Sequence, residues 1–165
     1  MPERSPRLEG KVAIVTGAGS SAEGIGNGKA TAILFAREGA KVLLVDRIEG
    51  RAEETQSRIL EEGGEASVIQ ADVTNLDDCY RMVGFAMDRY GRVDILDNNV
   101  GISQRGTVVE VSEAEWDRVM TVNLKSMVLT SKATIPRMME SRSGSIINIS
   151  SIAGLRAHSS TPYSA

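Results

Sequence analysis

The residues whose types and spacing best fit chemistry lie between positions 16 and 26, which read Thr-Gly-Ala-Gly-Ser-Ser-Ala-Glu-Gly-Ile-Gly. Glycines allow a tight turn in which backbone N–H groups approach a pyrophosphate, because a Cβ would block that approach or the packing of the next helix. Asp46 follows Gly26 by 20 residues and ends an apolar run. A carboxylate at that distance can accept hydrogen bonds from both hydroxyls of an adenosine ribose. The segment therefore predicts a dinucleotide-binding site.

Charge favours one dinucleotide over the other. The Asp46 carboxylate would repel a 2′-phosphate, and no basic residue lies inside the glycine turn. We therefore expect NAD rather than NADP, with Arg47 as a neighbouring cation that could contact a phosphate. The main alternative with this layout is an S-adenosylmethionine-dependent methyltransferase, which also uses an acid after its second strand. Such enzymes normally carry an acidic residue where this sequence has Thr16.

Strands and helices must position these side chains. Val/Ile/Leu-rich runs without polar alternation predict buried parallel strands, and helical stretches alternate with them. The strands are expected at 11–16, 41–46, 67–71, 93–98 and 145–150. The helices are expected at 24–38, 50–62, 76–90 and 112–140. This alternation predicts an α/β fold, a Rossmann-type doubly wound parallel sheet with strand order 3-2-1-4-5.

Local signals mark the ends of these helices. Asn75 and Ser112 stand where side-chain N-caps are wanted, and Glu115 completes a capping box with Ser112. Gly39 and Gly91 each follow a helix, where a left-handed C-terminal cap favours glycine.

Asp97 breaks the apolar pattern of the fourth strand. A carboxylate buried in a central strand costs several kcal/mol unless it is paired. We therefore expect Asp97 to have a partner or to lie at the exposed end of its strand.

Size and composition narrow the function classes. A chain of 165 residues suggests one domain, and a net charge of −3 gives no global electrostatic case for nucleic acid or an anionic membrane. The apolar runs are far shorter than the ~20 residues that cross a bilayer. Cys79 is the single cysteine, which excludes an internal disulfide and fits a reducing compartment, so we expect a cytoplasmic protein. No His/Cys/Asp spacing predicts a metal site.

Further motifs follow the glycine turn in order, each where a predicted strand ends or the next helix runs: Asp72-Val73, Asn98-Asn99-Val100-Gly101, Asn123 within Val-Asn-Leu, Ile149-Ser150-Ser151, and Tyr163-Ser164-Ala165. Together they resemble the short-chain dehydrogenase/reductase family, from Lys11 to Ala165. The glycine turn matches that family's Thr-Gly-x-x-x-Gly-x-Gly pattern with three extra residues between the glycines.

The resemblance implies an oxidoreductase that moves a hydride between NAD(H) and a small-molecule secondary alcohol or ketone. Tyr163 would be the general base, Ser151 would hydrogen-bond the substrate oxygen, and Asn123 would hold a water in the proton relay. Ser150 competes with Ser151 for the serine role. The cofactor-binding residues that the turn and the resemblance imply are Gly17, Ser20, Ser21, Gly24, Ile25, Gly26, Asp46, Asp72, Val73, Asn98, Asn99, Gly101 and Tyr163.

The same resemblance implies that parts of the fold follow Ala165. The family's lysine is expected at position 167, and strands six and seven come later still. We therefore expect residues 1–165 to form a single, C-terminally incomplete dinucleotide-binding domain that does not turn over by itself. A non-catalytic dinucleotide-binding module, or an inactive truncated remnant, stays open as an alternative. Family members commonly form homodimers or homotetramers, often through the helix that begins near Ser112.

Overall fold

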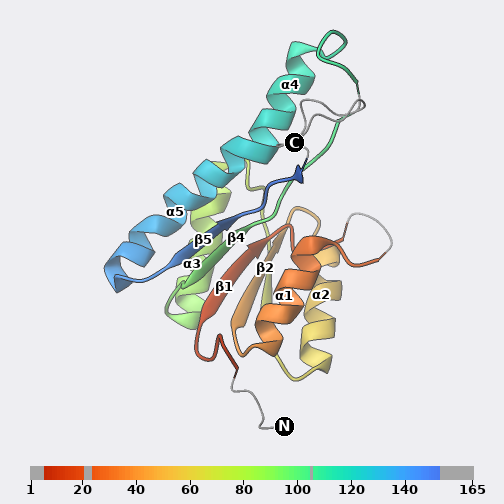
Figure 1. The fold of residues 1–165 in the computed structure, drawn as a ribbon. Coiled ribbons are helices and arrows are strands. Elements are labelled where there is room, and N and C mark those ends of the chain that lie inside the picture. The colour runs from red at the N-terminus through yellow and green to blue at the C-terminus, as the bar shows by residue number, and fades with distance from the viewer. Residues whose placement is uncertain (1–5, 21–23, 105, 153–165) are drawn as a thin grey trace.

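Five strands form one parallel sheet in a computed structural model that describes residues 6–20, 24–104 and 106–152 (Figure 1). The strand order is β3-β2-β1-β4-β5, which confirms the predicted order and fold class. The strands are β1 (Val12–Thr16), β2 (Lys41–Asp46), β3 (Glu65–Gln70), β4 (Ile95–Asn98) and β5 (Ser145–Asn148). The helices are α1 (Asn27–Arg37), α2 (Glu49–Glu61), α3 (Leu76–Tyr90), α4 (Glu113–Met120) and α5 (Ser126–Ser141), and a π-helical segment, η1 (Thr121–Lys125), joins the last two.

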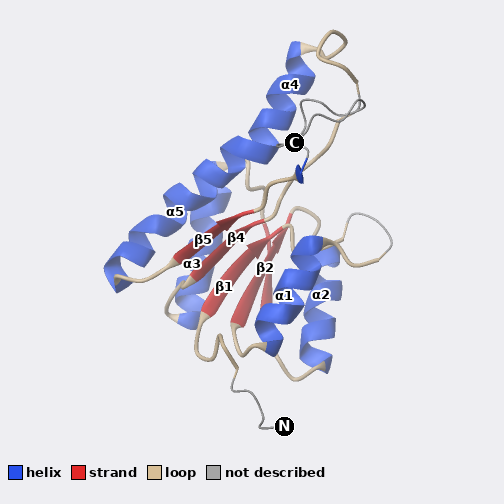
Figure 2. Ribbon diagram, viewed as in Figure 1, coloured by secondary structure: helices blue, strands red, loops and turns tan. Residues whose placement is uncertain are grey.

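The helices cover the sheet from both sides (Figure 2). Adjacent strand residues face opposite ways, so Ile14 of β1 packs in the core under α3 and α5 while Val15 packs in the core under α1 and α2. Both side chains are fully buried. Apolar residues on two faces explain why the strands read as continuous hydrophobic runs rather than alternating ones.

The predicted cap residues are confirmed. The Asn75 side chain accepts hydrogen bonds from the backbone N–H groups of Asp77 and Asp78 at 2.8 and 3.2 Å. Ser112 and Glu115 form the reciprocal capping box. Gly91 caps α3 with a φ of 77°, in the left-handed region that favours glycine.

Two helix predictions are wrong in their bounds. The first helix begins at Asn27 and not at Gly24, since Gly24 has a φ of 103° that no helix residue adopts. The stretch 112–140 is not one regular helix, because the five residues of η1 widen it between α4 and α5. Such π segments add one residue to a turn and are frequent at functional sites.

The expectation for Asp97 is also wrong. The residue is fully buried, and neither carboxylate oxygen has a hydrogen-bond partner among the described residues. Burial raises the pKa of the Asp97 carboxyl to about 6, because the charged form loses its hydration. Pairing places Asp97 between Val15 of β1 and Ile147 of β5, so its two neighbours in the sheet are apolar.

Candidate functional site

The carboxyl ends of β1 to β4 open onto a groove with a cavity volume of about 460 Å³. Ligands of doubly wound sheets bind at this edge, where the strand order reverses. The predicted cofactor-binding residues that line the groove are Gly17, Gly26, Asp46, Asp72, Val73, Asn99 and Gly101. They come from four different strand ends, and the fold therefore brings together residues that are far apart in the sequence.

The tightest backbone packing in the groove is that of Gly28 against Gly17, and the sequence analysis missed Gly28. A Cβ on Gly28 would overlap the carbonyl oxygen of Gly17 and would lie 2.5 Å from the Asn99 amide nitrogen. Gly28 stands in the first turn of α1 and also lines the groove. A Cβ on Gly26, by contrast, would meet nothing closer than 3.4 Å. The close helix–strand packing therefore depends on Gly28.

The packing of Gly28 changes which glycines are matched to the family's turn. The Gly-x-Gly pair that opens the helix is Gly26-Asn27-Gly28, not Gly24-Ile25-Gly26. Residues 18–25 then separate Gly17 from that pair, which makes the turn five residues longer than the family pattern rather than three.

The N-terminus of α1 is open toward the groove. Its N-cap, Gly26, makes no side-chain cap, and the Gly26 N–H donates to Ser20 Oγ at 2.9 Å. The N–H groups of the first turn have no intrahelical partner, and they carry the positive end of the helix dipole. The glycines Gly17, Gly26 and Gly28 put no Cβ beside the N–H groups of this first turn, and such an arrangement fits a pyrophosphate.

Asp46 lies beside this turn, as the spacing predicts. Its Oδ2 accepts a hydrogen bond from the Gly19 N–H at 3.1 Å, and its Oδ1 accepts one from the Ile48 N–H at 3.0 Å. The two N–H groups fix the orientation of the carboxylate. Arg47 and Arg51 also line the groove near this carboxylate.

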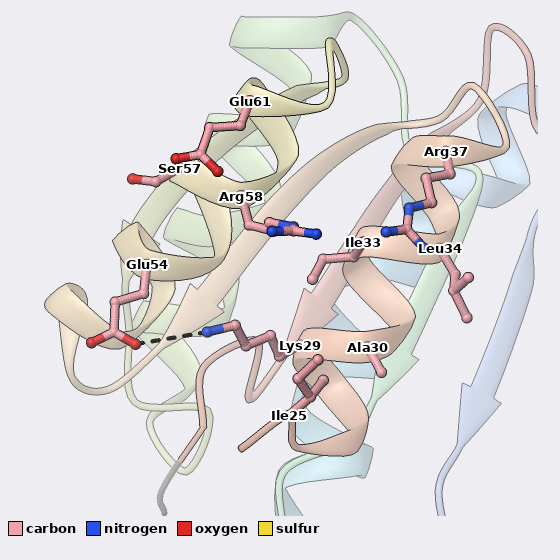
Figure 3. Close-up of a pocket in the computed structure, with 10 residues that line it drawn as sticks. All are labelled: Ile25, Lys29, Ala30, Ile33, Leu34, Arg37, Glu54, Ser57, Arg58 and Glu61. Carbon is pink, nitrogen blue, oxygen red and sulfur yellow. Dashed lines mark ion pairs between the residues drawn. The ribbon is translucent and has the colours of Figure 1, made fainter. Parts of the chain in front are cut away.

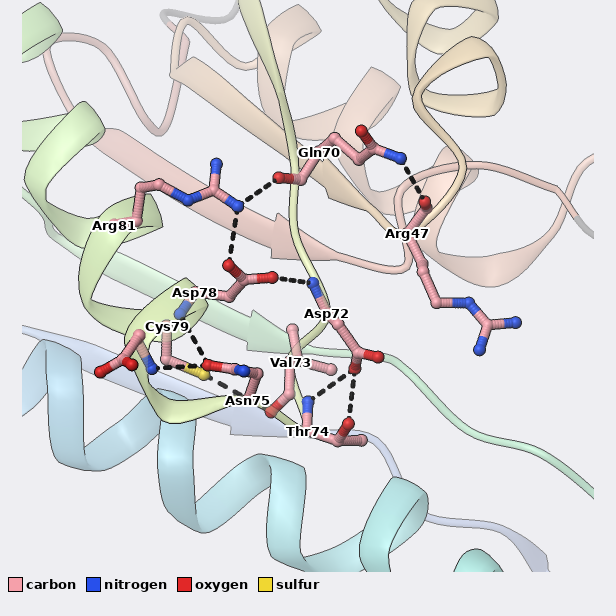
Figure 4. Close-up of polar contacts among 10 residues, drawn as sticks. Arg47, Gln70, Asp72, Val73, Thr74, Asn75, Asp78, Cys79 and Arg81 are labelled. Carbon is pink, nitrogen blue, oxygen red and sulfur yellow. Dashed lines mark hydrogen bonds and ion pairs between the residues drawn. The ribbon is translucent and has the colours of Figure 1, made fainter.

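Asp72 and Val73 form the wall of the groove beyond β3 (Figure 4). Asp72 Oδ1 accepts hydrogen bonds from the Thr74 N–H at 2.9 Å and the Thr74 hydroxyl at 2.6 Å. The Asp72 N–H donates to Asp78 Oδ2 at 2.8 Å, and Arg81 holds Asp78 from the other side at 2.8 Å. Among the residues drawn in Figure 4, the second Asp72 oxygen has no partner, which leaves it for a donor in the groove.

The two asparagines at the end of β4 have different surroundings. Asn99 lines the groove, and its N–H donates to Thr16 Oγ1 at 3.2 Å. Asn98 is buried and does not line the groove: its Nδ2 donates to Asn148 of β5 at 2.9 Å, and its Oδ1 accepts from the Thr130 hydroxyl at 2.7 Å. The Asn98 side chain therefore joins β4, β5 and α5.

Asn123 lies on η1 and holds the loop that follows β4. Its Oδ1 accepts from the Ile102 N–H at 2.8 Å, and its Nδ2 donates to the Ile102 carbonyl at 2.9 Å. The widened turn thus places an amide side chain against the backbone beside Gly101, the end of the glycine-containing motif. Two hydrogen bonds to one residue fix this loop at the rim of the groove.

Other predicted residues lie away from the groove or outside the description. Ile25 is 69% exposed and lines a separate groove between α1 and α2, where Lys29 pairs with Glu54 at 3.7 Å (Figure 3). Ser150 and Ser151 follow β5 and are exposed. Ser21 and Tyr163 lie outside the described residues.

Comparison with known proteins gives a consistent match. The family model described as short chain dehydrogenase matches residues 11–165. An uncharacterized oxidoreductase of Thermotoga maritima is 42% identical over 148 residues, which cover 90% of this chain and 56% of that protein. The 3-oxoacyl-[acyl-carrier-protein] reductase FabG of the same organism is 38% identical over 153 residues, 90% of this chain and 58% of the relative.

Solved structures agree with these relatives. A Burkholderia xenovorans protein superposes with a TM-score of 0.92 at 40% identity, over 96% of this chain and 64% of that one. A short chain dehydrogenase from Mycobacterium smegmatis gives a TM-score of 0.89 at 32% identity, over 98% of this chain and 66% of that one. The chain spans a little more than half the length of the two Thermotoga relatives.

Proposed function

Because the chain belongs to the short-chain dehydrogenase/reductase family, we propose that the full-length protein is an NAD(H)-dependent oxidoreductase of secondary alcohols or ketones. Family membership supports oxidoreductase chemistry and removes the methyltransferase alternative. The observation that carries the choice of cofactor is the Asp46 carboxylate, 3.1 Å from the Gly19 N–H at the rim of the groove. An adenosine ribose at this rim would donate both hydroxyls to Asp46, whereas a 2′-phosphate would meet its negative charge.

The residues that line the groove support the binding of a dinucleotide. Gly17, Gly28 and the N-terminus of α1 leave room and N–H donors for the pyrophosphate. Asp72 offers a carboxylate oxygen at the adenine end. When bound, the nicotinamide supplies the hydride acceptor or donor.

Proton transfer is assigned to Tyr163, Ser151 and Asn123. Tyr163 would take the proton of the alcohol, and since only about 0.1% of free tyrosine is phenolate at pH 7, its pKa must be lowered by a neighbouring cation. Ser151 would hydrogen-bond the substrate oxygen and stabilise its developing charge. Asn123 is anchored to Ile102 and is the candidate for the proton relay.

Two broader assignments belong to this proposal. We place the protein in the cytoplasm, supported by a single buried cysteine, Cys79. In the described residues no helix is both long and apolar enough to cross a membrane. A homodimer or homotetramer is supported by exposed apolar side chains along the α4–η1–α5 rod: Trp116, Leu124, Val128, Ile135 and Met139.

The decisive experiment uses the full-length protein, with NADH and NADPH titrated separately and a panel of secondary alcohols assayed with NAD. We expect NADH to bind more tightly than NADPH, and Asp46→Ala to reduce that preference. Tyr163→Phe should lower kcat by about 10²- to 10⁴-fold while leaving NADH affinity unchanged. NADH binding without turnover of any alcohol or ketone would instead indicate a binding module, and normal turnover by Tyr163→Phe would remove the catalytic assignment.

A further inference from the structure

Helix α2 contacts the glycine turn through one buried hydroxyl. Thr55 is fully buried, and its Oγ1 donates to the Ala18 carbonyl oxygen at 2.8 Å. The same hydroxyl lies 3.4 Å from the Arg51 carbonyl of its own helix, so the shorter bond, across 37 residues of sequence, is the better one. Neither Thr55 nor Ala18 lines the groove.

The peptide group that Thr55 holds is the one that holds Asp46. The Ala18 carbonyl and the Gly19 N–H belong to a single trans peptide, so they point in opposite directions from one rigid plane. The carbonyl accepts from Thr55 at 2.8 Å, and the N–H donates to Asp46 Oδ2 at 3.1 Å. Hydrogen bonds in such a chain also polarise one another.

The rest of the turn leaves this peptide little other freedom. The Ala18 N–H donates to the Val45 carbonyl of β2 at 3.2 Å. A Cβ on Gly19 would overlap the Arg51 Cβ and lie 3.0 Å from Asp46 Oδ2, so α2 packs directly against the turn. The strand and the helix thus fix the position of the peptide, and the Thr55 hydroxyl fixes the direction of its dipole.

We propose that Thr55 is a positioning residue that orients the Asp46 carboxylate toward the ribose of the dinucleotide, an inference that rests on the function proposed above. Thr55 touches no ligand itself. It acts through the 18–19 peptide, whose N–H fixes one oxygen of Asp46 while the Ile48 N–H fixes the other. Loss of the hydroxyl frees the peptide to rotate and leaves the carboxylate held at one oxygen.

The test compares Thr55→Val, which removes the hydroxyl at nearly constant shape, with Thr55→Ser, which keeps it. NADH affinity is measured by fluorescence titration in the full-length protein, alone and combined with Asp46→Ala. Thr55→Val should weaken NADH binding about fivefold to tenfold and narrow the preference over NADPH, with kcat changed less than KM. Thr55→Ser should restore the affinity, and in the Asp46→Ala background Thr55→Val should have no further effect.

Thr134→Val is the matched control. Thr134 is also a fully buried helical threonine, and its hydroxyl donates to the Thr130 carbonyl within α5 at 2.8 Å, far from Asp46 in the fold. It should lose stability without losing NADH affinity. If Thr55→Val does not fold, Thr55→Ala makes the same comparison.

The outcomes separate the inference from the proposed function. Unchanged NADH affinity in Thr55→Val overturns the inference alone. An equal loss in the wild-type and Asp46→Ala backgrounds also overturns it, because Thr55 would then act through the fold and not through Asp46. A wild-type protein that binds neither dinucleotide overturns the proposed function itself.

Discussion

The β1–β2 half and the β4–β5 half of the sheet differ in how their buried polar groups are hydrogen-bonded. On the β1–β2 side, the Ala18–Gly19 peptide, Thr55 and Asp46 each have hydrogen-bond partners supplied by the neighbouring loop or helix. On the β4–β5 side, Asp97 is fully buried without a partner among the described residues, and Ile147 of β5 is 36% exposed. The polar groups around the glycine turn are thus held by hydrogen bonds from β1 to α2, while β4 holds an unpaired carboxyl and β5 is partly exposed.

Replacing the unpaired Asp97 of β4 should have the largest effect on the stability of the fold. Folding raises the pKa of Asp97 from 3.8 to about 6, so the neutral form is favoured in the folded protein. The neutral Asp97 carboxyl therefore makes its full contribution to folding stability below about pH 4, and this contribution is lost as the pH rises through 6. Over this range the shift corresponds to about 3 kcal/mol. Asp97→Val should stabilise the protein at pH 7.5 and flatten this dependence, as measured by urea unfolding at several pH values.

Other carboxyl groups, such as those of Asp94 and Asp78, have lowered pKa values, so their protonation destabilises the fold only at more acidic pH. Asp94 and Asp78 are present in the wild type and in Asp97→Val, so the difference in unfolding free energy between these two proteins reports on the Asp97 carboxyl alone. Equal stability of the two proteins at pH 7.5 would show that Asp97 is paired or solvated in solution.

Adding a side chain at Gly28 of α1, beside the β1–β2 half of the sheet, should have the next largest effect on stability. A Cβ at Gly28 overlaps the Gly17 carbonyl, which is backbone and cannot rotate away. Gly28→Ala should cost about 2 kcal/mol of unfolding free energy and weaken NADH binding, because α1 must move off β1. Gly84→Ala is the control: nothing lies within 4 Å of its Cβ, so it should stabilise α3 by up to about 1 kcal/mol. A neutral Gly28→Ala would contradict the assigned close approach.

The smallest effect concerns the hydrogen bonds that join β4, β5 and α5 through Asn98. Thr130→Val removes the 2.7 Å donor to Asn98 Oδ1 and leaves a buried acceptor unpaired. We expect a loss of about 1 kcal/mol in thermal unfolding, with little change in NADH affinity because Asn98 does not line the groove. A large loss of NADH binding would instead connect this network to the cofactor site.

Sequence patterns predicted the elements well because those signals are local. Continuous apolar runs gave the strands and their order, and the cap residues gave α3 its observed bounds, Leu76–Tyr90. The start of α1 was wrong because Gly24, Gly26 and Gly28 alternate, and each spacing alone fits a Gly-x-Gly pair. Only the three-dimensional contact with Gly17 decides between them.

The site was predictable in part for the same reason. Asp46 ends β2 and Asp72 lies two residues after β3, so their place at the sheet edge could be inferred from sequence. Thr55 could not, because its hydroxyl reaches a carbonyl 37 residues away. Asp97 could not either, since its burial depends on the strands on both sides. The roles of Ser151 and Tyr163 stay predictions.

The widened turn at η1 sets a limit on how this region tolerates length changes. Each residue of a regular helix advances by about 100° around the axis. A one-residue deletion within Thr121–Lys125 would relieve the widening and restore this regular advance, yet it would pull Asn123 from the Ile102 loop. Single-residue gaps should therefore be rare in this segment among functional homologues, even though a deletion would leave a more regular helix.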